Sequence, residues 1–301
     1  MNRNVRAAAL LALCCSAAGI GLSGCDEAPA AEPGGGATTT TEAKEPAFTG
    51  AKKITVDGRS VTVSCSGQPE DGEPVVVLLA GAGDELKKFA DIQETLGAEN
   101  RVCSYDRLGA GASDQPGGPQ TLDDAGTVLT AVIDQVAGGA PVVLAGHSLG
   151  GLIAARYAPD HQDTVKGLVL MDATSPTQSA DLTASIPESA TGMAVQLRDE
   201  TLAAVQGQNP EQLAVPDGEV RSAGDLPVEV IQHGKPYLEA VPEYGPDLER
   251  AWAEGQRKWL TVSSRGNLSI AANSEHYIYV DEPELVVRAI QRVAVEATAA
   301  G

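Results

Sequence analysis

Two hydrophobic patterns alternate along most of the chain, and they predict different elements of secondary structure. Short runs of consecutive apolar residues are typical of strands that are buried on both faces of a sheet. Longer stretches with apolar residues every three or four positions are typical of helices. Strand-like runs occupy 74–80, 101–105, 141–145, 165–172 and 226–231, with a weaker one at 267–271, and helical patterns occupy 85–96, 121–137, 151–158, 243–260 and 282–298. This alternation predicts an α/β fold with a mostly parallel central sheet and helices on both faces.

Two segments depart from this alternation. Before the first buried run, K-I-T-V and S-V-T-V-S-C flank the dipeptide Asp57-Gly58, which is a strong signal for a β-hairpin. Residues 174–225 are rich in Pro, Ser, Thr, Asp and Glu, and they are too long for a connector in a compact sheet. They are therefore predicted to form a small, mostly helical lid over the carboxyl ends of the strands.

The first residues of the chain have the pattern of a secretory signal peptide. Residues 1–24 combine two arginines with an apolar run that is too short for a good membrane span. The segment ends in L-S-G-C at 22–25, which resembles the lipobox of bacterial lipoproteins, so Cys25 would be lipidated after cleavage behind residue 24. The alternative is an ordinary secretory signal that is cut nearby. In either case the domain is expected to work outside the cytoplasm, and the lipobox predicts a membrane attachment through Cys25.

Composition limits both the core and the partners. Residues 25–50 contain Pro, Gly, Ala, Thr and Glu with almost nothing large, so they are predicted to be a flexible tether. Hydrophobic residues make up 43% of the chain but aromatic residues only 3%, so Val, Leu, Ile and Ala must form the core. The net charge is −20, and such an acidic surface repels nucleic acid, which is not expected as a partner.

The pentapeptide Gly146-His147-Ser148-Leu149-Gly150 lies between a predicted strand and a predicted helix. A serine on so sharp a strand-to-helix turn presents its hydroxyl above the sheet. Its backbone is strained and crowds the positions two residues away, which explains the glycines. The following helix points its N-terminal N–H groups at the same place, where they can stabilise an oxyanion. Ser148 is therefore predicted to be a nucleophile.

Three motifs together resemble the α/β-hydrolase family, over about residues 52–298. They are G-H-S-L-G-G at the turn just described, Y-D-R-L-G-A-G-A-S-D at 105–114, and S-E-H-Y-I-Y-V-D-E-P-E-L-V at 274–286. The resemblance implies the α/β-hydrolase fold, with core segments at 51–173 and 226–301 on either side of the lid at 174–225.

The resemblance also implies partners for the serine, because a serine hydroxyl needs a base and the base needs an acid to orient it. His276 has the family's histidine context and is expected to be the base. The family often carries the acid after the seventh strand, but no aspartate stands in that turn here. Asp172, at the end of the sixth strand, is the preferred acid. The alternatives are Glu239, Glu243 and Asp247.

The resemblance further implies the oxyanion hole, which would be formed by the N–H groups of Leu149 and Ala82. Asp106 and Arg107 are interpreted as a structural ion pair that braces the loop around the site. Cys65 and Cys103 lie on strands that are neighbours in the family's sheet, so a disulfide between them is expected in an oxidising compartment. The alternative is two buried thiols.

These inferences together predict a serine hydrolase that cleaves a carboxylic ester or related acyl bond of a small molecule through an acyl-enzyme. No metal-ligand spacing or nucleotide-binding loop is found in the sequence, so no metal or other cofactor is expected. The alternatives on the same fold are an acyltransferase, a peptidase or a cofactor-free haloperoxidase. A non-catalytic binding protein on a hydrolase scaffold is a further alternative, and the missing aspartate after the seventh strand favours it.

Overall fold

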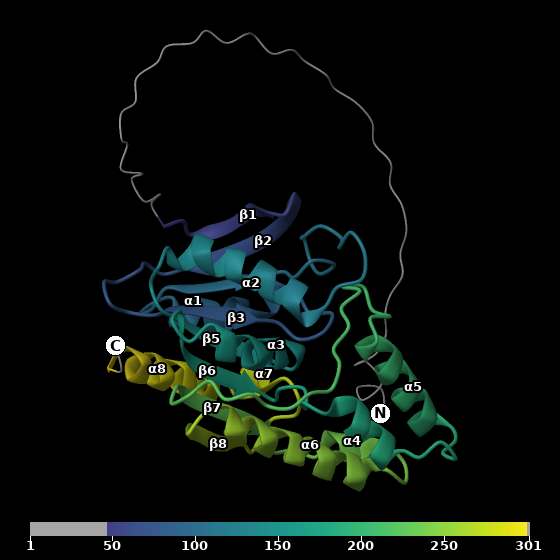
Figure 1. Ribbon diagram of the computed structural model, residues 1–301. Helices are drawn as coiled ribbons and strands as arrows, with labels where there is room; N and C mark the ends of the chain where they lie inside the picture. Colours follow the sequence, from purple (N-terminus) through teal and green to yellow (C-terminus); the bar gives the residue numbers. More distant parts are fainter. Residues whose placement is uncertain (1–46, 300–301) are drawn as a thin grey trace, which may run out of the picture. The chain divides into compact units, whose positions relative to one another are not determined.

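A computed structural model describes residues 47–299, which form an eight-stranded sheet between two layers of helices (Figure 1). The strand order is β1-β2-β4-β3-β5-β6-β7-β8. β1 and β2 pair antiparallel, β2 pairs antiparallel with β4, and all pairs from β4 to β8 are parallel. The predicted signal peptide at 1–24, the predicted lipidation site Cys25 and most of the predicted tether lie outside the described residues.

The predicted strands and helices are present with boundaries that differ by a few residues. The strands are Gly50–Val56 (β1), Arg59–Ser66 (β2), Val75–Leu79 (β3), Val102–Tyr105 (β4), Val142–His147 (β5), Val165–Met171 (β6), Pro227–His233 (β7) and Arg265–Ala271 (β8). The α-helices are Ala90–Leu96 (α1), Leu122–Ala137 (α2), Leu149–Tyr157 (α3), Gln178–Ser185 (α4), Met193–Val205 (α5), Gly245–Trp259 (α6), Ile278–Asp281 (α7) and Pro283–Ala299 (α8). Within residues 47–299, no helix is long and apolar enough to cross a lipid bilayer.

The core lies on both faces of the sheet, because successive side chains of a strand point to opposite faces. On one face, residues such as Val77 and Leu144 pack with α2, α3 and α6. On the other face, residues such as Leu78 and Val143 pack with α1 and α8. The continuous apolar runs of the sequence are therefore strands that are buried on both sides.

Three segments outside the parallel part of the sheet were also predicted from the sequence: the hairpin, the tether and the lid. Asp57 and Gly58 form the turn of the β1–β2 hairpin with φ values of 47° and 75°, as their sequence predicts. The predicted tether ends earlier than residue 50, because Phe48 already packs against the core and its carbonyl accepts a hydrogen bond of 3.0 Å from Arg101. The segment predicted as a lid, 174–225, contains α4 and α5 (Figure 1).

The expected disulfide between Cys65 and Cys103 is present. The two residues lie directly opposite each other in the antiparallel register of β2 and β4, and both are buried. The bond therefore joins the antiparallel edge of the sheet to its parallel part.

Candidate active site

Ser148 occupies a strained turn between β5 and α3, with φ 50° and ψ −119°. Non-glycine residues rarely adopt a positive φ, and such strain is concentrated at functional sites. A Cβ atom at Gly146 would lie 2.4 Å from the backbone of Gly150, and one at Gly150 would lie 2.1 Å from the carbonyl oxygen of Leu79. The tight turn requires glycine at 146, and the close approach of α3 to the end of β3 requires glycine at 150.

Four parallel strands bring the candidate residues together at the carboxyl ends of the strands. Ser148 follows β5, Asp172 follows β6, His233 ends β7, and His276 lies in the loop after β8. The Ser148 N–H donates to the carbonyl of Met171 (3.1 Å), and the Asp172 N–H donates to that of Ile231 (2.7 Å). Residues far apart in the sequence therefore meet because the carboxyl ends of adjacent parallel strands coincide.

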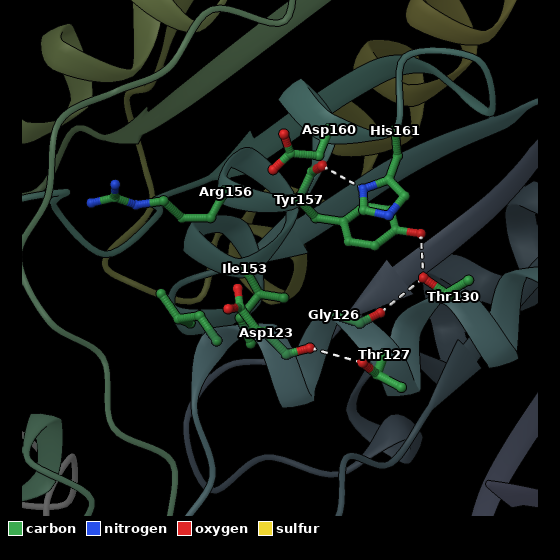
Figure 2. A pocket seen from close by; sticks show the side chains of 10 residues that line it. Asp123, Gly126, Thr127, Thr130, Ile153, Arg156, Tyr157, Asp160 and His161 are labelled. Atoms are coloured by element: carbon green, nitrogen blue, oxygen red, sulfur yellow. Dashed lines mark hydrogen bonds between the residues drawn. The ribbon is translucent and has the colours of Figure 1, made fainter. Parts of the chain in front are cut away.

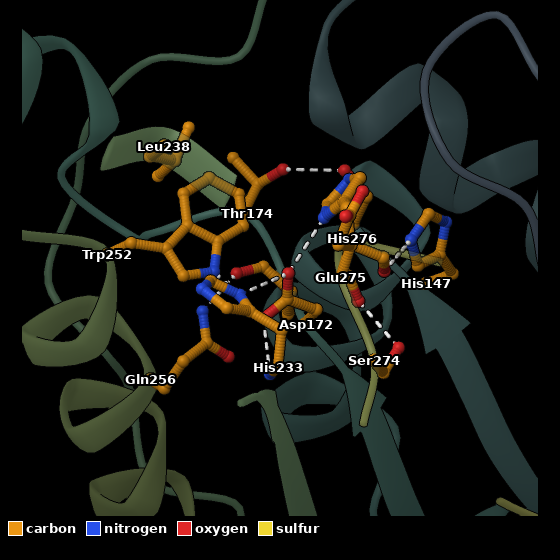
Figure 3. A network of polar contacts seen from close by, with 12 residues as sticks. His147, Asp172, Thr174, His233, Leu238, Trp252, Gln256, Ser274, Glu275 and His276 are labelled. Carbon is orange, nitrogen blue, oxygen red and sulfur yellow. Dashed lines mark hydrogen bonds and ion pairs between the residues drawn. The ribbon is translucent and has the colours of Figure 1, made fainter. Parts of the chain in front are cut away.

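His276 and Asp172 form a short hydrogen bond, with 2.7 Å between Nδ1 of the histidine and Oδ2 of the aspartate (Figure 3). Both side chains are buried. Because the carboxylate accepts the Nδ1 proton, the Nε2 lone pair of a neutral His276 is left to act as a base. Among the four acids considered from the sequence, Asp172 is the one in contact with His276 within residues 47–299.

Asp172 accepts further hydrogen bonds that the sequence did not predict. Nδ1 of His233 lies 2.9 Å from each carboxylate oxygen, and Nε1 of Trp252 donates to Oδ1 at 2.9 Å. Figure 3 shows these side chains and His276 converging on the carboxylate. Burial by itself raises the pKa of Asp172, but the hydrogen bonds from His233 and His276 outweigh burial and hold this pKa well below its usual range. Asp172 is therefore ionised at neutral pH.

His233 has a second carboxylate on its other side, which belongs to Glu249 of α6. The Nε2 atom of His233 lies 2.9 Å from Oε2 of Glu249, and only 3% of the His233 residue is exposed. Burial lowers the pKa of His233, but the hydrogen bonds to Asp172 and Glu249 raise it to about 9.

His147 supports the loop that carries His276. Its Nε2 atom lies 3.0 Å from the carbonyl oxygen of His276, and the two rings are 4.5 Å apart. Burial, followed by the nearby His276, lowers the pKa of His147 to about 3, so this ring is neutral and donates the hydrogen bond. A neutral His147 therefore packs against the ring of His276 and holds the backbone of this loop.

The Ser148 hydroxyl does not reach His276 in this conformation. Its Oγ atom lies 3.5 Å from Oγ1 of Thr174, and no hydrogen bond between Ser148 and His276 is present within residues 47–299. Contacts of this kind are often long before substrate binds. Rotation about one side-chain bond of Ser148 changes the direction of the hydroxyl without moving the turn.

The two predicted oxyanion donors, Leu149 and Ala82, belong to α3 and to the loop after β3, whose backbones are in close contact. Leu149 is the first residue of α3, so its N–H has no acceptor within the helix. Ala82 lies in the loop after β3, and its N–H donates no hydrogen bond among the described residues. A Cβ atom at Gly150 would lie 2.6 Å from the carbonyl oxygen of Ala80, so α3 packs directly on this loop.

The predicted ion pair between Asp106 and Arg107 is wrong, although both residues brace the site. Directly after β4, neighbouring side chains point in opposite directions. Asp106 accepts backbone hydrogen bonds from Leu86 (2.7 Å) and Ala112 (2.9 Å). Arg107 instead forms a buried, two-pronged ion pair with Glu211 at 2.6 and 2.7 Å.

Arg107 also holds the loop that carries Ala82. Its guanidinium donates to the carbonyl oxygens of Ala80 (2.5 Å) and Gly81 (2.8 Å). Burial disfavours the charge of Arg107, but Glu211 raises the pKa of Arg107 above its usual range. The segment predicted as a lid, 174–225, therefore contributes the carboxylate that holds Arg107 against the loop after β3. The sequence contained no signal for this contact, because the two residues are far apart in the chain.

None of the other acids considered from the sequence forms a hydrogen bond or an ion pair with His276 within residues 47–299. Glu239 and Glu243 are exposed, and Asp247 forms an ion pair with Arg250 on α6. The residue of α6 that joins the site is Glu249, which the sequence analysis did not identify. Together with Trp252 and Gln256 it has the three-to-four residue spacing of one helix face, which was the available signal.

A cavity of about 260 Å³ lies between α2 and α3, outside this site (Figure 2). Tyr157 and His161 stack in its wall with their rings 3.6 Å apart, and Arg156 borders it. The cavity is not lined by Ser148 or His276. His161 is half-buried in this wall.

Comparison with known proteins agrees with this geometry. Residues 74–198 match the sequence model of a family described as alpha/beta hydrolase fold. The crystal structure of the enol-lactonase from Burkholderia xenovorans LB400 superposes with a TM-score of 0.56 and 17% sequence identity, covering 81% of this chain and all of that one. The sheet order, the strained serine turn and this superposition show that the chain has the α/β-hydrolase fold.

Two curated relatives match shorter segments. The human (Lyso)-N-acylphosphatidylethanolamine lipase is 31% identical over 114 residues, which are 37% of this chain and 33% of the lipase. A putative carbamate hydrolase, RutD, of Klebsiella pneumoniae is 36% identical over 106 residues, which are 35% of this chain and 39% of that protein. The chain thus spans well under two thirds of the length of these relatives.

Proposed function

We propose that this protein is a serine hydrolase that cleaves a carboxylic ester or a related acyl bond of a small molecule. The observation that carries the proposal is the 2.7 Å hydrogen bond between His276 and Asp172 at the same sheet edge as the strained Ser148. In this proposal Ser148 is the nucleophile, His276 the general base and Asp172 the acid that orients it.

In the proposed reaction His276 first accepts a proton from Ser148 and then passes it to the leaving group. Nε2 of His276 takes the proton from Oγ of Ser148 as the oxygen attacks the acyl carbon. The N–H groups of Leu149 and Ala82 donate to the oxyanion of the tetrahedral intermediate. His276 then returns the proton to the leaving group, and an acyl-enzyme forms at Ser148. A water molecule activated by His276 releases the acid in the second half of the reaction.

The relatives support acyl chemistry. The names of three similar proteins, a lipase, a putative carbamate hydrolase and an enol-lactonase, denote hydrolysis of esters, carbamates or lactones, which are all acyl compounds. The aromatic side chains around His276, namely Tyr237, Trp252 and Tyr277, have ring centres 5.5 to 5.9 Å from its ring. They would form the wall against which the acyl or leaving group packs.

The test is covalent labelling of the purified full chain with a fluorophosphonate probe, followed by identification of the labelled peptide. We expect one label on Ser148, none on the Ser148→Ala variant, and much slower labelling of His276→Ala. Ser264→Ala is the matched control, because Ser264 is exposed just before β8, at the opposite end of the sheet. A folded parent chain that is not labelled would contradict the proposal and favour a binding protein.

We also propose that the protein is extracytoplasmic and attached to the membrane by lipid on Cys25. The L-S-G-C sequence at 22–25 supports the lipid, and the Cys65–Cys103 disulfide supports an oxidising compartment. Mass spectrometry of the mature protein is expected to find Cys25 as the first residue, with a diacylglyceryl group on its sulfur. A mature N-terminus at another residue would exclude lipidation and leave secretion as the alternative.

A further inference from the structure

His233 is an additional histidine on the acid of the proposed triad. It ends β7 and lies between two carboxylates, with Nδ1 2.9 Å from both oxygens of Asp172 and Nε2 2.9 Å from Oε2 of Glu249. Its own backbone N–H also points to Asp172, at 3.2 Å from Oδ1. The reaction described above does not use this residue.

The contacts of His233 favour one protonation state of its ring. A neutral imidazole has one N–H donor and one lone pair, whereas an imidazolium has two donors. A lone pair facing a carboxylate oxygen at 2.9 Å would be repelled. Because both ring nitrogens face carboxyl oxygens, these contacts favour an imidazolium with hydrogen on both nitrogens, and they raise the pKa of His233 to about 9.

We propose that His233 is a positioning residue, an imidazolium that links Asp172 to Glu249 of α6 and sets the pH range in which His276 acts as a base. The inference rests on the proposed function and deepens it. It adds a charged link between the triad acid and the helix that forms one wall of the site.

The side chains that face His233 from the elements packed against it include two carboxylates and two neutral rings. Asp172 and Glu249 are the two carboxylates, at the end of β6 and on α6. The Tyr237 ring lies 4.9 Å away, and burial raises the pKa of Tyr237 well above its usual range, so that side chain is neutral. Trp252 is 6.4 Å away and carries no charge. The remaining titratable neighbour is His276, on the far side of the shared carboxylate.

The consequence concerns the moment when His276 accepts the serine proton. It then becomes a second imidazolium on the same carboxylate, and the positive charge of His233 disfavours it. A charged His233 therefore makes His276 harder to protonate and moves the acidic limb of the activity profile to lower pH. Glu249 acts in the opposite direction, because its negative charge favours a protonated His276.

The first test reads the protonation of His233 directly. Nitrogen-15 NMR of the histidine rings is practical because the chain has four histidines, and His233→Asn identifies the signals. We expect both nitrogens of His233 to carry hydrogen at pH 7 and to remain so until about pH 9. A His233 ring with a single N–H at pH 7 would overturn the inference. This measurement needs no substrate, so it stands even if the hydrolase proposal fails.

The second test compares two variants whose effects should have opposite sign. His233→Asn keeps a neutral donor to Asp172 but removes the positive charge, so the midpoint of the acidic limb of kcat/KM should rise by about 1 pH unit. Glu249→Gln removes a negative charge and keeps an acceptor, so the midpoint should fall by about half a unit. Hydrolysis of p-nitrophenyl acetate, or the rate of fluorophosphonate labelling, gives the profile.

Glu254→Gln is the matched control, because it makes the same chemical change at an exposed position of α6 and should leave the midpoint where it is. If His233 had only a structural role, His233→Asn and Glu249→Gln would both lower kcat or stability, and the midpoint of the acidic limb would not move in opposite directions. Shifts of the same sign, or no shifts, would overturn the positioning role. A chain with no activity and no labelling but with a doubly protonated His233 would contradict the proposed function alone.

Discussion

Replacing Asp172 with asparagine is expected to lower kcat/KM for ester hydrolysis by about 10³–10⁴-fold. The carboxylate accepts the Nδ1 proton of His276 at 2.7 Å, which leaves Nε2 as the base. An asparagine amide can present its own N–H₂ group to Nδ1, and the ring proton then moves to Nε2. In that tautomer His276 cannot take the proton from Ser148, although every side chain keeps its place.

The measurement is the rate of p-nitrophenyl acetate hydrolysis by the parent and the variant, with urea unfolding of both to show that the variant is folded. The backbone at Asp172 has φ 46°, which asparagine tolerates well. Near-parent activity in the variant would contradict the role of Asp172. A comparable loss in a variant of Glu239, Glu243 or Asp247 would then transfer the role to that residue.

Replacing Glu211 with glutamine is expected to lower the free energy of unfolding by about 3–5 kcal/mol, because the change leaves the buried charge of Arg107 without its partner. Arg107 is only 5% exposed and Glu211 only 3%, and two hydrogen bonds of 2.6 and 2.7 Å join their side chains. Arg107 stays charged, since a guanidinium does not lose its proton in proteins. The loop that carries Ala82 should loosen with it, so activity should fall as well.

The test compares the free energy of unfolding in urea of Glu211→Gln, which breaks a buried ion pair, with that of Asp160→Asn, which breaks an exposed one. Asp160 also forms a two-pronged ion pair with an arginine, Arg221, but both side chains are more than half exposed. Its loss should change stability little, because water screens and replaces the interaction. The double variant Arg107→Met/Glu211→Leu should be more stable than Glu211→Gln. Equal stability of the two single variants would contradict the role given to burial.

Local pattern was sufficient for the elements that carry the site. The run at 74–80 is apolar at every position because β3 is buried on both faces, and the helix from 122 begins where Thr121 caps its first turn. The serine turn was predictable for the same local reason, since glycines two residues on either side of Ser148 are a steric requirement. His276 and Asp172 needed the order of motifs along the chain in addition.

The pattern of contacts between distant segments was not predictable in this way. Arg107 seemed to have a partner in its neighbour Asp106, but its partner is Glu211, more than a hundred residues further along the chain. Glu249 looked like any other acidic residue of an amphipathic helix. Neither position carries a local signal, because an ion pair depends on which side chains converge and on how much water they exclude.

Local sequence patterns predict the strands and helices, the strained serine turn and a small set of candidate bases and acids. Each of these follows from residues within a few positions of one another. The contact of Asp172 with His276, and the position of His233 between Asp172 and Glu249, depend instead on how distant segments pack. The physical reason is that the parallel strands β5 to β8 and helix α6 bring these groups within hydrogen-bond distance. The low polarity around them then determines which side chains carry charge.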